Sequence, residues 1–259
     1  MSPRAAITPI LETHGLRKAF GGHVVLDGVD LAFEPNRLSA LIGPNGAGKT
    51  TCFNLLTGFL QPDDGAIRFK GQDITVLPPD RRARLGMCRS FQILNLFNDY
   101  TVLENIRVAV PAMRARGFDL WTPAPAVSEA EDRAARIIRL IGLVGREHVE
   151  AKYLSYGQRR LLEIGVALAG EPELLLLDEP TSGLGARPME TLRDLVQQLT
   201  SGLTIVVIEH DMDFVLSLSH HIAVLHRGTV IAEGPPDAIR DQAEVRDAYL
   251  GRLAYARAR

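Results

Sequence analysis

A glycine-rich segment near the N-terminus constrains this chain more than any other feature. Residues 43–50 read Gly-Pro-Asn-Gly-Ala-Gly-Lys-Thr, which fits the phosphate-binding pattern GxxxxGK[ST]. The apolar run 38–42 before it predicts a buried strand, and residues 51–60 after it predict a helix. Glycines let backbone N–H groups turn toward phosphate oxygens, and the helix N-terminus adds positive potential. This context predicts a nucleotide site where Lys49 reaches the β- and γ-phosphates and Thr50 ligates Mg²⁺.

A second motif supplies two carboxylates. The leucines at 174–177, bounded by Pro172 and Pro180, predict a strand buried on both faces of a parallel sheet. Asp178 and Glu179 follow at its carboxyl end, where open α/β sheets bind ligands. We expect Asp178 on the Mg²⁺ side and Glu179 beside the attacking water, which it orients and polarises. The alternative is a pair of solvated loop carboxylates, which the nearby phosphate loop disfavours.

A third motif points to a family. Residues 154–158, Leu-Ser-Tyr-Gly-Gln, resemble the LSGGQ signature of ATP-binding cassette (ABC) proteins, with Tyr156 replacing the first glycine. Ser155 is suited to cap the following helix, and Gly157 lets the backbone approach a phosphate closely. In this family the motif closes over the γ-phosphate that the opposite subunit holds. The resemblance therefore implies a head-to-tail dimer of ATPase subunits, identical or paralogous.

Further matches follow in the order of the family's motifs. The resemblance implies that Phe20 stacks on adenine, that Gln92 touches Mg²⁺ and the attacking water, and that His210 contacts the γ-phosphate. Without the other motifs, a lone histidine after an apolar strand is more often structural. The implied catalytic residues are Lys49, Gln92, Glu179 and His210, and the implied metal ligands are Thr50, Gln92 and Asp178. The implied nucleotide-binding residues are Phe20, Gly43, Pro44, Asn45, Gly46, Ala47, Gly48, Lys49, Thr50, Thr51, Ser155, Gly157 and Gln158.

The resemblance spans about residues 10–250 and implies a single ABC ATPase domain of α/β class. Its parts would be a RecA-like phosphate-loop NTPase core, an antiparallel β subdomain, and a helical signature subdomain at about 93–163. Alternating apolar residues and turn signals predict the antiparallel sheet in 10–35 and 65–75. Arg227-Gly228 predicts a hairpin, and Ile137, Ile138 and Ile141 form an apolar helical stripe. Residues 251–259 are expected to be a flexible tail.

Several segments resemble the ATP-binding subunits of branched-chain amino-acid importers, with urea and short-chain amide importers as close relatives. These segments are 20–22, 91–92, 95–97, 101–105, 209–212 and 248–251. Two departures stand out. Gly185 occupies a position where most cassettes carry Asp, and Gly165-Val166 replaces the usual Ala-Arg. The apolar residues around 92–100 are expected to be covered, either by the helical subdomain or by a permease helix.

Composition indicates which classes of partner and which cell compartment to expect. Formal charge is −2, from 29 basic and 31 acidic residues, so no general basic field favours nucleic acid. Two cysteines, Cys52 and Cys88, lack ligand spacing and are expected to be buried or half-buried in a reducing compartment. The sequence has no long apolar run and no apolar signal-peptide core. We expect a cytoplasmic protein, held at the inner face of the membrane by permease subunits and served indirectly by an extracytoplasmic solute-binding protein.

Four arginines precede the predicted glutamine loop, Arg81, Arg82, Arg84 and Arg89. They suggest a solvated helix face with one or two ion pairs, or a contact to a dimer partner or permease. The leading functional hypothesis is the ATP-hydrolysing subunit of an importer for branched-chain amino acids or a related polar solute, which energises transport through separate membrane permeases. The rivals are a soluble ABC ATPase acting in DNA repair or translation, a non-hydrolysing cassette, and a phosphate-loop kinase. The first rival would carry long insertions or two cassettes, and the second would have lost Glu179 or His210. A phosphate-loop kinase would not need the signature motif.

Overall fold

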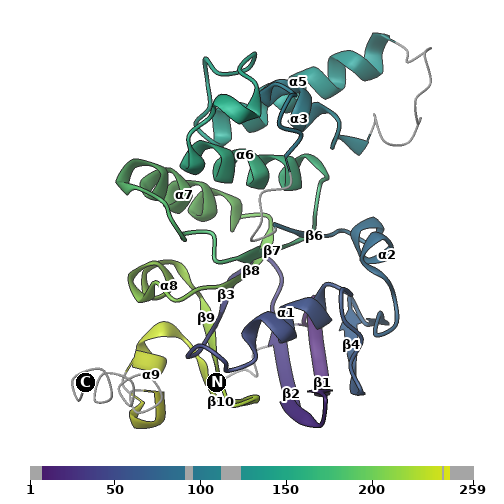
Figure 1. Cartoon of the computed structure of the whole chain (residues 1–259), viewed down its shortest axis with the longest axis vertical. Coiled ribbons are helices and arrows are strands. Elements are labelled where there is room, and N and C mark those ends of the chain that lie inside the picture. Colours follow the sequence, from purple (N-terminus) through teal and green to yellow (C-terminus); the bar gives the residue numbers. More distant parts are fainter. Residues whose placement is uncertain (1–7, 91–95, 112–123, 241, 246–259) are drawn as a thin grey trace, which may run out of the picture. The chain divides into compact units, whose positions relative to one another are not determined.

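The computed structural model describes residues 8–90, 96–111, 124–240 and 242–245, and in helix α5 the side chains from residue 128 onward. The chain divides into two compact units (Figure 1). The first comprises Met1–Leu85 and Thr200–Arg259, and the second comprises Gly86–Leu199. Each unit is described by itself below.

The first unit contains the predicted antiparallel sheet. Its strand order is β2-β1-β4-β5, and all three pairings are antiparallel. In β2, the alternate residues Val29, Leu31 and Phe33 are buried, as the period-two pattern predicts. The strands are β1 (Leu11–Phe20), β2 (His23–Phe33), β4 (Asp64–Phe69) and β5 (Gln72–Asp73).

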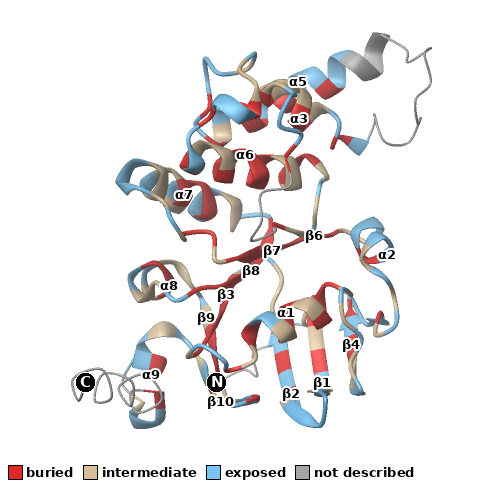
Figure 2. Ribbon diagram, in the orientation of Figure 1, coloured by how far each residue is buried: buried red, intermediate tan, exposed pale blue. Residues whose placement is uncertain are grey.

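A parallel layer in the same unit carries the phosphate loop. Strand β3 (Leu38–Ile42) pairs in parallel with both β8 (Thr204–Ile208) and β9 (His221–His226). Both β3 and β8 are buried along their whole length, as Figure 2 shows in red. Strand β10 (Thr229–Gly234) returns antiparallel to β9, which confirms the predicted hairpin at Arg227-Gly228. The helices of this unit include α1 (Lys49–Leu56), α2 (Pro79–Arg84), α8 (Met212–Leu218) and α9 (Pro236–Arg240).

Arg82 of α2 corrects the expectation of a solvated arginine face. It is only 1% exposed, and its guanidinium donates to four carbonyl oxygens. Two of these, on Leu55 and Leu56 at 2.6 and 2.8 Å, belong to the last turn of α1, where carbonyls have no intrahelical partner. Burial lowers the pKa of Arg82 to about 10. Arg82 therefore caps the helix that follows the phosphate loop.

The second unit joins two short parallel strands to a helical region. Strand β6 (Met87–Arg89) pairs in parallel with β7 (Leu174–Asp178), which is buried throughout as predicted. Helices α3, α5 and α6 contact one another (Figure 1). The helical elements are α3 (Val102–Arg107), α5 (Ala124–Leu140), the 3₁₀ turn η1 (Ala151–Tyr153), α6 (Tyr156–Ala169) and α7 (Ala186–Leu199).

The helical packing explains one sequence departure. Ile137, Ile138 and Ile141 are buried, which confirms the predicted stripe. A Cβ atom added to Gly165 would lie 2.8 Å from Cδ1 of Ile141 and 3.1 Å from Cγ2 of Ile137. Glycine at this position of α6 therefore permits the close approach of α5.

The two cysteines agree with the expectation from sequence. Cys52 in α1 is fully buried and Cys88 in β6 is half-buried, and both are free thiols. Burial raises the pKa of Cys52 to about 12. Among the described residues, none of the helices combines the length and apolar character that crossing a membrane requires.

Candidate nucleotide site

The phosphate loop bends sharply between β3 and α1, and two glycines make the bend possible. A Cβ atom on Gly43 would lie 2.1 Å from the carbonyl oxygen of Leu225. Gly48 has a φ of 104°, and a Cβ atom there would lie 2.7 Å from Cδ2 of Leu26. L-residues rarely adopt that φ, so a side chain at Gly48 would meet both backbone strain and a clash. The glycines at these two positions are required by the local geometry.

Lys49 lies within this loop. Its ammonium donates to the carbonyl oxygens of Gly43 at 2.7 Å and Pro44 at 3.1 Å, and the residue is 8% exposed. Thr50 and Thr51 follow it in the first turn of α1, whose N-cap residue, Gly48, provides no side-chain acceptor. The loop therefore presents a cation and a helix N-terminus at one place, which suits an anion.

His210 follows β8 at the same edge of the parallel layer. Because Leu41 of β3 is in register with Ile208 of β8, the phosphate loop and His210 both begin just beyond neighbouring strand ends. The imidazole is 59% exposed, and its Nδ1 lies 3.8 Å from Oε2 of Glu209. Glu209 itself is fully buried and accepts from the backbone N–H groups of His210 and Asp211 at 3.0 and 3.4 Å. Glu209, which the sequence analysis did not assign, shapes the turn that carries His210.

Phe20, the predicted adenine-stacking residue, ends β1 in the same unit. Its side chain is on the surface, with the residue 46% exposed. The ammonium of Lys18 lies 5.6 Å from the ring centroid. An exposed aromatic face of this kind is available for stacking.

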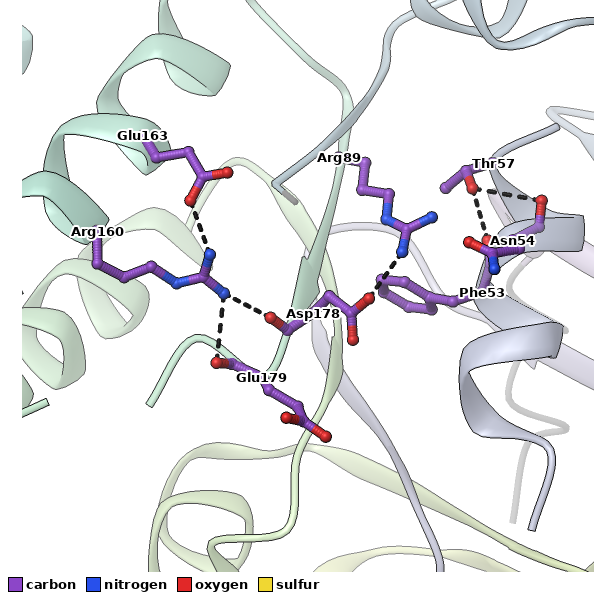
Figure 3. Close-up of polar contacts among 8 residues, drawn as sticks. All are labelled: Phe53, Asn54, Thr57, Arg89, Arg160, Glu163, Asp178 and Glu179. Atoms are coloured by element: carbon purple, nitrogen blue, oxygen red, sulfur yellow. Dashed lines mark hydrogen bonds and ion pairs between the residues drawn. The ribbon is translucent and has the colours of Figure 1, made fainter. Parts of the chain in front are cut away.

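The carboxylate pair ends β7 in the second unit. The side chain of Asp178 is 4% exposed, and its Oδ2 lies 2.7 Å from Nη2 of Arg89, the last residue of β6 (Figure 3). Arg89 thus confirms the expected ion pair but corrects the expected solvated face, because its side chain is only 10% exposed. Glu179 has a φ of 46°, in the left-handed region that non-glycine residues seldom adopt. Asp178 is therefore buried beside a counter-charge, and Glu179 is held in an unusual backbone conformation.

The predicted glutamine loop starts beside Asp178. Arg89 is in register with Leu176, and the N–H of Ser90 donates to the carbonyl of Leu176 at 2.9 Å. Gln92 lies outside the described residues. The chain that leads to it leaves β6 at the same sheet edge where β7 delivers Asp178 and Glu179.

The signature segment forms the N-terminus of α6. Ser155 accepts from the N–H of Gln158 at 3.3 Å, and Gln158 Oε1 accepts from the N–H of Ser155 at 3.0 Å. This reciprocal capping box confirms the predicted cap. Gly157 has a packing reason within its own subunit, because a Cβ atom there would lie 2.7 Å from Cγ of Pro188. Tyr156 lies beside Gly183, whose added Cβ would be 3.0 Å from the tyrosine ring.

A buried ion pair in α6 was not predicted. Nη1 of Arg160 lies 2.7 Å from Oε2 of Glu163, and their side chains are 2% and 7% exposed. Nη2 of Arg160 donates to the carbonyl oxygens of Asp178 and Glu179, the latter at 3.3 Å (Figure 3). A charged pair at positions i and i+3 within an apolar helix is the sequence signal that could have revealed it.

The donors fit ATP and Mg²⁺. The glycine loop, the Lys49 ammonium and the start of α1 offer cationic and N–H groups to phosphates. Mg²⁺ prefers oxygen ligands and is commonly held by one or two protein side chains together with phosphates. The Thr50 hydroxyl of the first unit and the Asp178 carboxylate of the second unit each offer oxygen donors of that kind.

Comparison with known proteins identifies the class. The ABC transporter family profile matches residues 26–182, and a profile described as branched-chain amino acid ATP-binding cassette transporter matches residues 229–254. The chain belongs to the ATP-binding cassette family of transporter ATPases. This confirms the predicted α/β phosphate-loop fold and the ATPase class.

Individual relatives agree with this assignment. The chain is 42% identical over 250 residues to the high-affinity branched-chain amino acid transport ATP-binding protein LivG of Escherichia coli, which covers 94% of this chain and 98% of LivG. It is 43% identical over 250 residues to the corresponding protein BraF of Pseudomonas aeruginosa, with the same coverage. A crystal structure of the ADP conformation of an ATP-binding cassette of an ABC transporter matches with a TM-score of 0.80 at 32% identity, covering 94% of this chain and 99% of that chain.

Proposed function

We propose that this chain is the ATP-hydrolysing subunit of an importer for branched-chain amino acids, acting through separate membrane permeases. The observation that carries the proposal is the glycine-built phosphate loop with Lys49 folded into it, in a chain that resembles branched-chain transport subunits over 94% of its length. In this proposal both units belong to one ABC ATPase domain over residues 10–250, with the helical subdomain near 93–163. The chain works at the cytoplasmic face of the membrane, where the permeases hold it.

The proposed chemistry is hydrolysis of the γ-phosphate. The phosphate loop binds and orients ATP, and Lys49 neutralises charge on the β- and γ-phosphates. Phe20 stacks on the adenine. Glu179 orients the attacking water and polarises it, while His210 and Gln92 hold the γ-phosphate and that water in line. Thr50, Gln92 and Asp178 would hold Mg²⁺, which supplies charge neutralisation at the phosphate oxygens when it is bound.

We propose that two such chains, or this chain and a paralogue, share their ATP sites head to tail. The signature helix α6 begins at a capping box that leaves Ser155 exposed and Gln158 half-buried at its N-terminus. An anion is stabilised at a helix N-terminus. Ser155, Gly157 and Gln158 of one subunit then close over the γ-phosphate that the other subunit binds.

The proposed permease contact is the segment 97–100 of the second unit. Asn105, 1% exposed, accepts from the N–H of Phe97 at 2.9 Å and donates to the carbonyls of Phe97 and Tyr100 at 3.0 and 3.1 Å. The rings of Phe97 and Tyr100 stack with centroids 5.0 Å apart, yet the two residues are 58% and 44% exposed. A rigid pair of exposed aromatic rings suits an interface that another protein covers.

A paired experiment tests this function. Lys49→Ala should abolish ATP hydrolysis, because the phosphates lose their cation. Glu179→Gln should bind ATP but hydrolyse it at least about 100-fold more slowly, because water activation is lost while the cradle remains. Turnover by Glu179→Gln at the wild-type rate would exclude the assigned role.

A transport measurement distinguishes the proposed function from that of a soluble ABC ATPase in DNA repair or translation. The full-length chain is co-purified with its membrane partners, which are identified and reconstituted with the solute-binding protein in vesicles. Leucine, isoleucine and valine uptake should require ATP and should stop with Lys49→Ala. Co-purification with ribosomes or DNA repair proteins instead of permeases would overturn the importer proposal.

A further inference from the structure

We propose that Arg160 is a positioning residue for hydrolysis: it clamps the main chain of Glu179 in its left-handed conformation, while Glu163 holds Arg160 in place. This inference rests on the proposed role of Glu179 in ATP hydrolysis. It adds a link inside one subunit between the signature helix α6 and that subunit's own water-activating carboxylate.

The backbone of Glu179 needs such a clamp. At a φ of 46°, the Cβ of an L-residue crowds its own backbone, so this conformation persists only where the surroundings over-determine it. The side-chain direction of a residue depends on its backbone angles. If Glu179 relaxed to an ordinary φ, its carboxylate would point elsewhere.

Arg160 provides the restraint through one nitrogen. Its Nη2 donates to the carbonyl oxygens of both Asp178 and Glu179, so it fixes the peptide planes on the two sides of the Glu179 Cα (Figure 3). The planar guanidinium presents these donors in a fixed geometry, which a flexible ammonium does not reproduce.

Glu163 fixes the guanidinium from the other side. Its Oε2 lies 2.7 Å from Nη1 of Arg160, and both side chains are nearly fully buried, at 7% and 2% exposure. A buried guanidinium requires a counter-charge, and the carboxylate one helical turn away on α6 supplies it. The chain of contacts therefore runs from Glu163 to Arg160 to the main chain of Glu179, within the second unit.

The test compares Arg160→Lys with a matched control in the full-length chain. Arg160→Lys keeps the positive charge but removes the planar guanidinium and its fixed arrangement of N–H donors. It should lower kcat for ATP about 10- to 100-fold, because small displacements of a catalytic group are costly, and leave KM for ATP within about twofold. The control is Arg133→Lys. Arg133 also pairs with a carboxylate, Glu171 at 2.7 Å, and donates to a carbonyl, that of Leu168 at 3.2 Å, so its replacement should leave kcat unchanged.

A double-mutant cycle separates positioning from general structural damage. Single-turnover hydrolysis is measured for Glu179→Gln with and without Arg160→Lys. If Arg160 acts through Glu179, the second change adds less than about a twofold loss, because the group it positions is already disabled. If the two losses multiply, Arg160 acts independently of Glu179 and the proposal falls.

Other outcomes also test the positioning role of Arg160. Wild-type kcat in Arg160→Lys, or a raised KM with unchanged kcat, overturns the proposal. If Arg160→Lys does not fold, Glu163→Gln carries the test, since it keeps an acceptor oxygen but removes the charge. A Glu163→Gln variant with wild-type kcat then overturns the proposal. A wild-type chain that hydrolyses no ATP, alone or with its permeases, would instead overturn the proposed function.

Discussion

Arg89 and Asp178 form a buried ion pair that joins the ends of two parallel strands, with Nη2 of the arginine 2.7 Å from Oδ2 of the aspartate. Their side chains are 10% and 4% exposed. The carboxylate proposed to ligate Mg²⁺ therefore has a protein counter-charge of its own. Removing one member of a buried pair leaves an uncompensated charge, which costs more than the pair contributes in net stability.

Arg89→Met should accordingly destabilise the protein by about 3 kcal/mol, measured by thermal or denaturant unfolding without nucleotide. The double variant Arg89→Met/Asp178→Asn should recover much of this loss, because no buried charge remains. Arg107→Met is the control, since the Arg107–Glu131 pair is longer at 3.6 Å and both side chains are more exposed, at 34% and 52%. Equal destabilisation in the single and double variants would contradict this account.

The cap on helix α1 predicts a second stability effect. Arg82→Met removes the donors for four carbonyl oxygens in a site that is 1% exposed, and should cost about 3 kcal/mol or more. Arg84→Met is the matched control, because the Arg84 side chain is 71% exposed and its ion-pair distance to Asp80 is 3.9 Å. Unfolding of both variants in urea gives the comparison, and similar midpoints would refute the capping role.

The shared ATP sites predict a defect that spares local binding. Ser155→Arg should block closure of the ATP-bound dimer, because a large side chain would fill the space for the opposite γ-phosphate. ATP binding to the isolated monomer through Lys49 should persist. Both are measured, closure by size-exclusion chromatography in the Glu179→Gln background and binding by a fluorescent nucleotide. Loss of monomer binding in a folded variant would exclude the head-to-tail assignment.

The aromatic pair predicts an uncoupled variant. Phe97→Glu places a charge on the exposed ring pair and should abolish transport while the ATPase activity of the isolated chain stays within about twofold of wild type. Val144→Glu is a control at another surface residue, 65% exposed. Normal assembly and uptake by Phe97→Glu would exclude this segment as the permease contact.

The buried Cys52 thiol predicts a pH dependence at the alkaline end. The pKa of this thiol is about 12 in the folded protein against a reference value of 9.0. Between these two pH values the folded state keeps the thiol proton, whereas the unfolded state loses it. This contribution to stability is complete below pH 9 and declines as pH rises toward 12. The stability difference between wild type and Cys52→Ala, measured by urea unfolding, should therefore shrink above pH 9. A difference that is constant up to pH 11 would contradict the prediction.

Local patterns made much of this protein predictable. The phosphate loop, the strand of leucines before Asp178 and the capping box at Ser155 each depend on residues that are neighbours in sequence. Hydrophobic periodicity predicted the antiparallel sheet and the buried stripe at Ile137, and the Arg227-Gly228 turn predicted the β9–β10 hairpin. In each case the spacing of the residues along the sequence determines which of them can come into contact.

By itself, then, the sequence determined the class of fold and the candidate phosphate, carboxylate and signature residues. Only the tertiary structure decided how the arginines are used. Arg89 and Asp178 are 89 positions apart, and no local pattern distinguishes buried Arg82 from its exposed neighbours on α2. The left-handed backbone of Glu179 and its clamp by Arg160 likewise depend on α6 packing beside the end of β7. Such contacts arise from long-range packing, which sets the burial and partners of a charged side chain independently of its neighbours in sequence.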